Sequence, residues 1–204
     1  DGSLSLIASK KSNVRNPDDL KGKNISVSGN TFVEYATDEV MKRACLHPGE
    51  VNKPEINNIP LRLMMLEDGQ ISASFLPGPA TAIALNDGHT ALLNTRQMGL
   101  RCTGIVFSEK AITEKDEEIR RFITGYNLGV KYLQTRPQNK WTEILVKEFG
   151  LQIDLPDYRS ATRPSYHDIE KIIAWLKSKG AIPDYYPGEN LVDTTFIPGT
   201  LKPQ

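Results

Sequence analysis

Cysteine and histidine are scarce in this sequence, which holds two cysteines and three histidines in 204 residues. Cys45 and Cys102 belong to no Cys-x-x-Cys pair and lie near no histidine at the spacing of zinc ligands. The pattern therefore offers no sign of a zinc or dithiol redox site. Cys45 falls on the apolar stripe of an expected helix, so we predict a buried thiol there. A disulfide with Cys102 stays open, because two cysteines alone cannot establish one.

An excess of charge and long apolar runs are missing as well. The 25 lysines and arginines balance 25 aspartates and glutamates, which gives a net charge of zero. This balance argues against a nucleic-acid partner, because such proteins usually present a basic face. No apolar run approaches the ~20 residues of a membrane-spanning helix, so we expect a soluble chain.

The motifs of common catalytic sites are also absent from the sequence. It contains no Gly-x-Ser-x-Gly elbow, no Walker loop, no His-Glu-x-x-His and no dinucleotide-binding fingerprint. His47, His89 and His167 fall at a helix end, a turn and a helix start, where we expect solvent-facing or capping roles. We therefore predict no catalytic residue, no metal site and no cofactor.

Short apolar runs alternate with helical patterns over residues 1–100. Because strands that alternate with helices favour a parallel sheet covered on both faces, we predict an α/β domain with a mainly parallel sheet. Thr31 and Glu34 are expected to form a capping box at the start of the first helix. Strands are expected at 4–8, 25–27, 55–59, 71–75 and 91–93, and helices at 31–46, 61–67 and 79–85.

The pattern becomes mostly helical over residues 101–204. After one further strand at 103–107, we expect helices over about 113–134, 140–149 and 165–180, and an extended surface strap over 181–204. The second part is therefore treated as a C-terminal helical segment. Its first helix carries an apolar stripe that is expected to be buried, made of Ile119, Phe122, Ile123, Tyr126 and Val130.

Two segments have the physical properties of a binding site. Ser28, Gly29, Asn30 and Thr31 join an expected strand to a helix start, where free amides and hydroxyls suit an anion or a carboxylate. An ordinary capped turn is the alternative. Phe75, Pro77 and Gly78 lie at and after the end of the strand expected at 71–75, directly after Ser74, and ligands of open α/β sheets bind outside the carboxyl ends of strands. A proline-rich turn is the alternative there. Asn58, near another strand end, is expected to add an amide group.

Four stretches of the sequence together resemble a known family. Pro17-Asp18-Asp19-Leu20-Lys21-Gly22-Lys23 is moderately specific alone, and the order of all four strengthens the match. They are similar to solute-binding proteins of ABC importers, of the nitrate, sulfonate, taurine and pyrimidine-precursor type. The stretches are 16–27, 66–80, 106–109 with the helix through 126, and 175–180 with 191–196.

The resemblance implies a fold, a partner and a location. It implies a periplasmic-binding-protein type II lobe over 1–100, and a helical part that returns to a first lobe whose N-terminal part this chain lacks. A small solute, anionic or heterocyclic, would be captured by hinge closure and delivered to an ABC permease, outside the cytoplasm. Helices left uncovered could support self-association. Two alternatives stay open: an enzyme on the same fold, of the menaquinone-pathway or thiamin-pyrimidine type, and a ligand-sensing domain.

Overall fold

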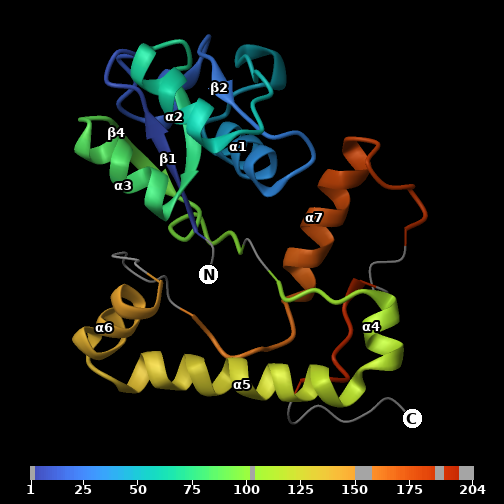
Figure 1. The fold of residues 1–204 in the computed structure, drawn as a ribbon. Helices are drawn as coiled ribbons and strands as arrows, with labels where there is room; N and C mark the ends of the chain where they lie inside the picture. The colour runs from blue at the N-terminus through green and yellow to red at the C-terminus, as the bar shows by residue number, and fades with distance from the viewer. Residues whose placement is uncertain (1–2, 102–103, 150–157, 187–190, 198–204) are drawn as a thin grey trace. The chain divides into compact units, whose positions relative to one another are not determined.

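The computed structural model describes residues 3–101, 104–149, 158–186 and 191–197. The chain divides into two compact units, each described here by itself (Figure 1). Residues 2–102 with 175–181 form the first, which we call the α/β unit. Residues 103–174 and 182–204 make up nearly all of the second, the helical unit. The segment 175–181 therefore packs with a part of the chain that precedes it by more than 70 residues.

A four-stranded sheet in the order β2-β3-β1-β4 forms the centre of the α/β unit. β2 is parallel to β3, whereas β1 is antiparallel to both of its neighbours, β3 and β4. It follows that β2, β3 and β4 run in one direction and β1 in the other. The strands are β1 (Leu4–Ala8), β2 (Ile25–Ser26), β3 (Ala73–Pro77) and β4 (Thr90–Asn94).

The α/β fold class is as predicted, but the mainly parallel sheet needs a correction. Three strands do share a direction, yet both ladders that β1 forms are antiparallel. Apolar periodicity specifies the two faces of a strand and not its direction, so the sequence could not show that β1 enters between β3 and β4. Antiparallel pairing also needs no crossover helix, which removes the constraint on which the prediction was based.

Helices cover both faces of this sheet (Figure 1). Leu6, Ala8 and Phe75 belong to a core shared with α1, whereas Ile7 and Leu76 belong to a core shared with α2 and α3. The alternation along each strand is the period of two that places successive side chains on opposite faces. The helices of the unit are η1 (Pro17–Leu20), α1 (Phe32–Arg43), η2 (Pro48–Glu50), α2 (Ile59–Asp68) and α3 (Gly78–Asn86).

Two of the predicted strands are not found as such. Over residues 55–59 there is only an isolated bridge between Val27 and Glu55, because α2 already begins at Ile59 with Asn58 as its cap. Residues 104–107 contain no strand, and residue 103 lies outside the described residues. Both expected strands are segments of five residues with only two or three large apolar side chains, and segments this short do not by themselves distinguish a strand from other buried chain.

The prediction of a buried thiol at Cys45 is wrong. α1 ends at Arg43, and Cys45 has a left-handed backbone angle, φ 52°, and is exposed. The Leu46 amide donates to the carbonyl of Met41 at 2.9 Å, which closes the helix two residues earlier than the apolar stripe implied. Cys102 lies outside the described residues, so a disulfide between the two is not tested.

The helical unit contains α4 (Glu109–Glu114), α5 (Asp116–Thr135), α6 (Gln138–Phe149) and most of α7 (Tyr166–Ser178). α4 was not predicted. Ile119, Ile123 and Val130 of the expected stripe are buried, but Phe122 is 52% exposed. The described part of the tail contributes Phe196 to this core, and Arg120 Nη1 donates to the carbonyl of Thr195 at 3.0 Å. Among the described helices, none combines the length and apolar character needed to cross a membrane.

Candidate functional site

The ends of β2 and β3 bring the two predicted binding segments to one edge of the sheet. Because these strands are parallel, the turn after β2, at residues 28–31, and the start of α3, at Pro77 and Gly78, both follow carboxyl ends. We call this the carboxyl edge. Open α/β sheets bind their ligands outside this edge, so the geometry places both segments where a ligand would be expected.

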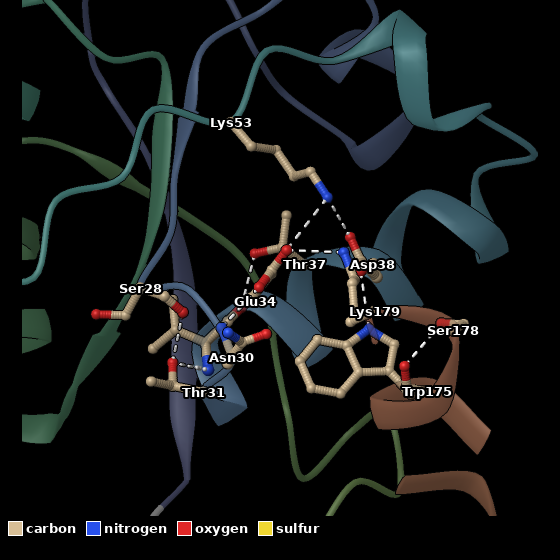
Figure 2. A network of polar contacts seen from close by, with 11 residues as sticks. Ser28, Asn30, Thr31, Glu34, Thr37, Asp38, Lys53, Trp175, Ser178 and Lys179 are labelled. Atoms are coloured by element: carbon tan, nitrogen blue, oxygen red, sulfur yellow. Dashed lines mark hydrogen bonds and ion pairs between the residues drawn. The ribbon is translucent and has the colours of Figure 1, made fainter. Parts of the chain in front are cut away.

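Thr31 and Glu34 cap the first turn of α1 (Figure 2). Thr31 Oγ1 accepts from the amide of Val33 at 3.2 Å and donates to the carbonyl of Ser28 at 2.8 Å. Glu34 Oε2 accepts from the amide of Asn30 at 2.8 Å, one residue before the position that a capping box uses. Asn30 has a left-handed φ of 55°, which turns its amide toward that carboxylate. The protein's own carboxylate therefore already occupies one amide of the predicted anion turn.

A second carboxylate, that of Glu55, reaches the same turn. A Cβ added to Gly29 would lie 3.1 Å from Glu55 Oε1, so glycine leaves room for this side chain. Glu55 Oε1 accepts from Asn57 Nδ2 at 3.3 Å, and Asn57 Oδ1 accepts from the Ser28 hydroxyl at 2.6 Å. Ser28 is 8% exposed, whereas Glu55 and Asn57 are exposed.

Beneath Ser28 lies a charged residue that sequence reasoning missed. Arg62 is 2% exposed. Its guanidinium donates to the carbonyl of Ile56 at 2.6 Å, to that of Phe75 at 3.4 Å, and through Nη2 to Ser28 Oγ at 2.9 Å. Burial lowers the pKa of Arg62 below its ordinary value. One signal could have revealed this residue: Arg62 precedes the buried Leu66 by four positions and so shares its helix face.

The remaining predicted site residues have different surroundings. Asn58 Oδ1 accepts from the amide of Leu61 at 2.9 Å and caps α2, so the asparagine that contacts Ser28 is its neighbour Asn57. The ring of Phe75 is fully buried in the core. Pro77 caps α3 without a side-chain hydrogen bond, and Gly78 is exposed with open space where a Cβ would lie. No side chain of Pro77 or Gly78 therefore covers the N-terminus of α3.

A charged cluster on α1 was also missed by sequence reasoning (Figure 2). Lys179 Nζ lies 2.7 Å from Glu34 Oε1 and 2.9 Å from Asp38 Oδ2, while Lys53 Nζ lies 2.7 Å from Asp38 Oδ1. Trp175 Nε1 donates to Asp38 Oδ2 at 2.9 Å. These contacts hold residues 175–181 against α1. The charges of the two carboxylates and the two ammonium groups cancel, so the cluster has no net charge. No local pattern relates residues some 140 positions apart.

These contacts change the ionisation of the acids. Burial raises the pKa of Asp38, but hydrogen bonds from Lys53, Trp175 and Lys179 outweigh it, so its pKa is lowered. The pKa of Glu34 is lowered in the same way, by Lys179 and the Asn30 amide against its burial. Both acids are therefore held in their charged form.

A histidine lies at the opposite edge of the sheet. His89 is 5% exposed, which corrects the expectation of a solvent-facing side chain. Its Nδ1 accepts from the amide of Lys10 at 3.0 Å, so Nε2 carries the proton toward Glu67, 2.9 Å away. Lys10 follows the end of β1 and Glu67 lies in the last turn of α2, and since β1 is antiparallel to β3, this histidine is distant from the carboxyl edge. Within the described residues no group of three or more His, Cys, Asp or Glu side chains could hold a metal ion.

A family model described as NMT1/THI5 like matches residues 2–140, about two thirds of the chain. The chain belongs to this NMT1/THI5-like family. Membership confirms the resemblance that the four sequence stretches carried. No curated protein sequence matches the chain.

Solved structures share the fold of this NMT1/THI5-like chain. The periplasmic aliphatic sulphonate binding protein SsuA from Escherichia coli has a TM-score of 0.73 at 11% identity, over 93% of this chain and 68% of that one. The alkanesulfonate-binding protein SsuA from Xanthomonas axonopodis pv. citri, bound to MOPS, has a TM-score of 0.70 at 18% identity, over 88% and 65%. The chain thus spans about two thirds of the length of these proteins.

An enzyme also shares the fold. The desulfurization enzyme DSZB has a TM-score of 0.62 at 10% identity, over 96% of this chain and 74% of that one. All of these likenesses confirm the predicted periplasmic-binding-protein type II fold. Because binding proteins and an enzyme use it alike, the fold alone does not decide between them.

Proposed function

We propose that the chain is part of the substrate-binding component of an ABC importer, which captures a small solute by hinge closure. The observation that carries the proposal is the fold likeness to the Escherichia coli SsuA protein over 93% of the chain, within the NMT1/THI5-like family. Its partner is an ABC permease, and its place of action is outside the cytoplasm. Neither catalysis nor a cofactor is part of this mechanism.

The carboxyl edge supports the proposal through the groups that it offers a solute. Ser28, Gly29 and Thr31 lie on one side of the edge and Pro77 with Gly78 on the other. Closure of a second lobe over such an edge would remove the solute from water, which strengthens its hydrogen bonds to the protein.

Amide chemical shifts of the full 204-residue chain, titrated with alkanesulfonates and with neutral pyrimidines, would test the proposal. This readout detects weak binding as well as strong binding. We expect saturable shifts at the amides of residues 28–31 and of Gly78, Ala80 and Thr81, and solute recovered unchanged. The variant Gly78→Gln adds a side chain into open space at the edge and should weaken binding, whereas Asp87→Gln at the opposite edge should not.

The rival function is catalysis, which the likeness to DSZB favours. Mass spectrometry of the solute after incubation distinguishes the two. Turnover of any panel solute would replace the transport proposal with an enzyme, and shifts confined to residues away from the carboxyl edge would overturn the site.

A further inference from the structure

A buried positive charge without an acidic partner lies directly under the carboxyl edge. Within the described part of the chain, no carboxylate forms an ion pair with the Arg62 guanidinium. Its three acceptors are neutral: the carbonyls of Ile56 and Phe75 and the hydroxyl of Ser28. Burying a charge is costly unless it is paired, so an unpaired guanidinium at 2% exposure needs a compensating role.

The hydrogen bonds give the Ser28 hydroxyl a direction. Because Nη2 of Arg62 donates to Ser28 Oγ, one lone pair of that oxygen is occupied by the buried guanidinium. The Ser28 proton is therefore donated away from Arg62, to Oδ1 of the exposed Asn57 at 2.6 Å. Asn57 is exposed, so rotation of its side chain would release this proton to another acceptor. Once Asn57 has moved, the Ser28 hydroxyl is a hydrogen-bond donor at the carboxyl edge, and the positive charge of Arg62 lies next to it.

We propose that Arg62 is a positioning residue that makes the carboxyl edge selective for anionic solutes, by orienting the Ser28 hydroxyl and supplying the countercharge. The proposal rests on the proposed function and narrows its solute class from anionic or heterocyclic to anionic. On binding, the anion accepts the Ser28 proton in place of Asn57 Oδ1. No covalent bond changes.

Glu55 acts against this selectivity and supplies a second test. Its exposed carboxylate reaches Gly29 and ends the chain of hydrogen bonds that runs from Arg62 through Ser28 and Asn57. A solute anion there would meet a like charge. Removal of the Glu55 charge should therefore strengthen anion binding, in contrast to removal of the Arg62 charge.

The experiment uses matched probes, propane-1-sulfonate and the neutral propane-1-sulfonamide, titrated into the full chain while the amide shifts of residues 28–31 are followed. We expect the wild type to prefer the sulfonate at least about tenfold. Arg62→Met should reduce that preference below about twofold, and Arg62→Lys, which keeps the charge but not the planar fork, should fall between. Glu55→Gln should raise sulfonate affinity about twofold, and Asp68→Asn at the opposite edge should leave it unchanged.

A buried arginine can be needed for folding, so circular dichroism is recorded for each variant. If Arg62→Met does not fold, Ser28→Ala carries the test: it leaves the guanidinium in place, removes the oriented hydroxyl and should lower sulfonate affinity about fivefold or more. Equal affinity for the two probes in the wild type overturns the proposal. So does an unchanged preference in folded Arg62→Met or Ser28→Ala.

The two failures are distinguishable. If both probes or neutral pyrimidines bind at the carboxyl edge without charge preference, the role of Arg62 is wrong and the binding function stands. If neither sulfonates nor pyrimidines bind in the titration of the full chain, the binding function is overturned and the role of Arg62 with it.

Discussion

Asn30 shows how a single backbone angle sets up the turn at the carboxyl edge. Its φ of 55° lies in the left-handed region, which costs most residues about 1 kcal/mol, costs asparagine less and costs glycine nothing. The same angle presents the Asn30 amide to Glu34. The turn is therefore tied to α1 through the backbone conformation of this residue.

This geometry predicts losses of different size for two substitutions at Asn30. Asn30→Ala should lower the free energy of unfolding by about 1 kcal/mol, because alanine resists the left-handed angle, whereas Asn30→Gly should change it by less than about 0.5 kcal/mol. Urea unfolding followed by circular dichroism measures both. Equal losses in the two variants would mean that the asparagine side chain matters rather than the angle.

Sequence reasoning could predict Thr31 as a cap but not Arg62 as a buried charge. Capping is local: a hydroxyl, a helix start and an acid three residues later lie within one short window. The environment of Arg62 depends on Ile56, Phe75 and Ser28, which three different segments bring together. Asn58 illustrates the same limit: α2 begins two residues earlier than expected, so Asn58 caps this helix and Asn57 contacts Ser28 instead.

At the scale of elements, α1 connects the carboxyl edge with the segment 175–181. Glu34 accepts from Asn30 at the start of α1 and pairs with Lys179, and Asp38 one turn later pairs with Lys53 and Lys179. The Trp175 ring packs edge-on against Tyr35 with centroids 5.4 Å apart. The sequence predicted α1 itself, because a helix depends on local spacing. It did not predict that α1 binds the segment 175–181, because these contacts join residues far apart in the sequence.

Loss of the Lys179 ammonium should loosen this segment. Lys179→Met removes two charge-assisted contacts and should cost about 1–3 kcal/mol in the unfolding of the α/β unit. Lys171→Met, at an exposed lysine of α7 eight residues before Lys179, is the matched control and should cost less than about 0.5 kcal/mol. Hydrogen exchange at the amides of residues 175–181 should accelerate only in Lys179→Met. Similar exchange in both variants would contradict a role for the ion pairs.

Acid should release the same segment. The folded pKa values of Asp38 and Glu34 are lowered from 3.8 and 4.5, so their ionisation stabilises the native state above the unfolded values. That contribution begins to decline as pH falls to the unfolded pKa and is lost as pH falls through the folded one. Trp175 fluorescence in a Trp141→Phe background should therefore change below about pH 4.

The control for the acid transition is Asp38→Asn in the same single-tryptophan background. This variant keeps the side-chain shape and removes one titrating group that contacts Trp175. Its fluorescence should depend less on pH over the same range. A transition of unchanged size and midpoint would show that other groups govern it.

At the scale of the whole molecule, the two units differ in how completely their apolar surfaces are buried. The sheet of the α/β unit is buried on both faces, whereas α5 is buried along only part of its apolar stripe. The sequence predicted burial of the complete stripe because periodicity shows which side chains share a face, and it cannot show whether the chain itself covers them. Phe122 packs edge-on against Phe107 and still remains 52% exposed.

Self-association stays a prediction, and this surface is where we expect it. Phe122, a member of the stripe, is 52% exposed on α5, and exposed apolar surface favours contact with a partner. Sedimentation of the full chain should show an average mass that rises above that of one chain with concentration, and Phe122→Glu should reduce the rise. Val146→Glu is the control, since Val146 is 49% exposed on another helix, α6. A constant single-chain mass at all concentrations would contradict self-association, and an equal effect of Val146→Glu would remove α5 as its location.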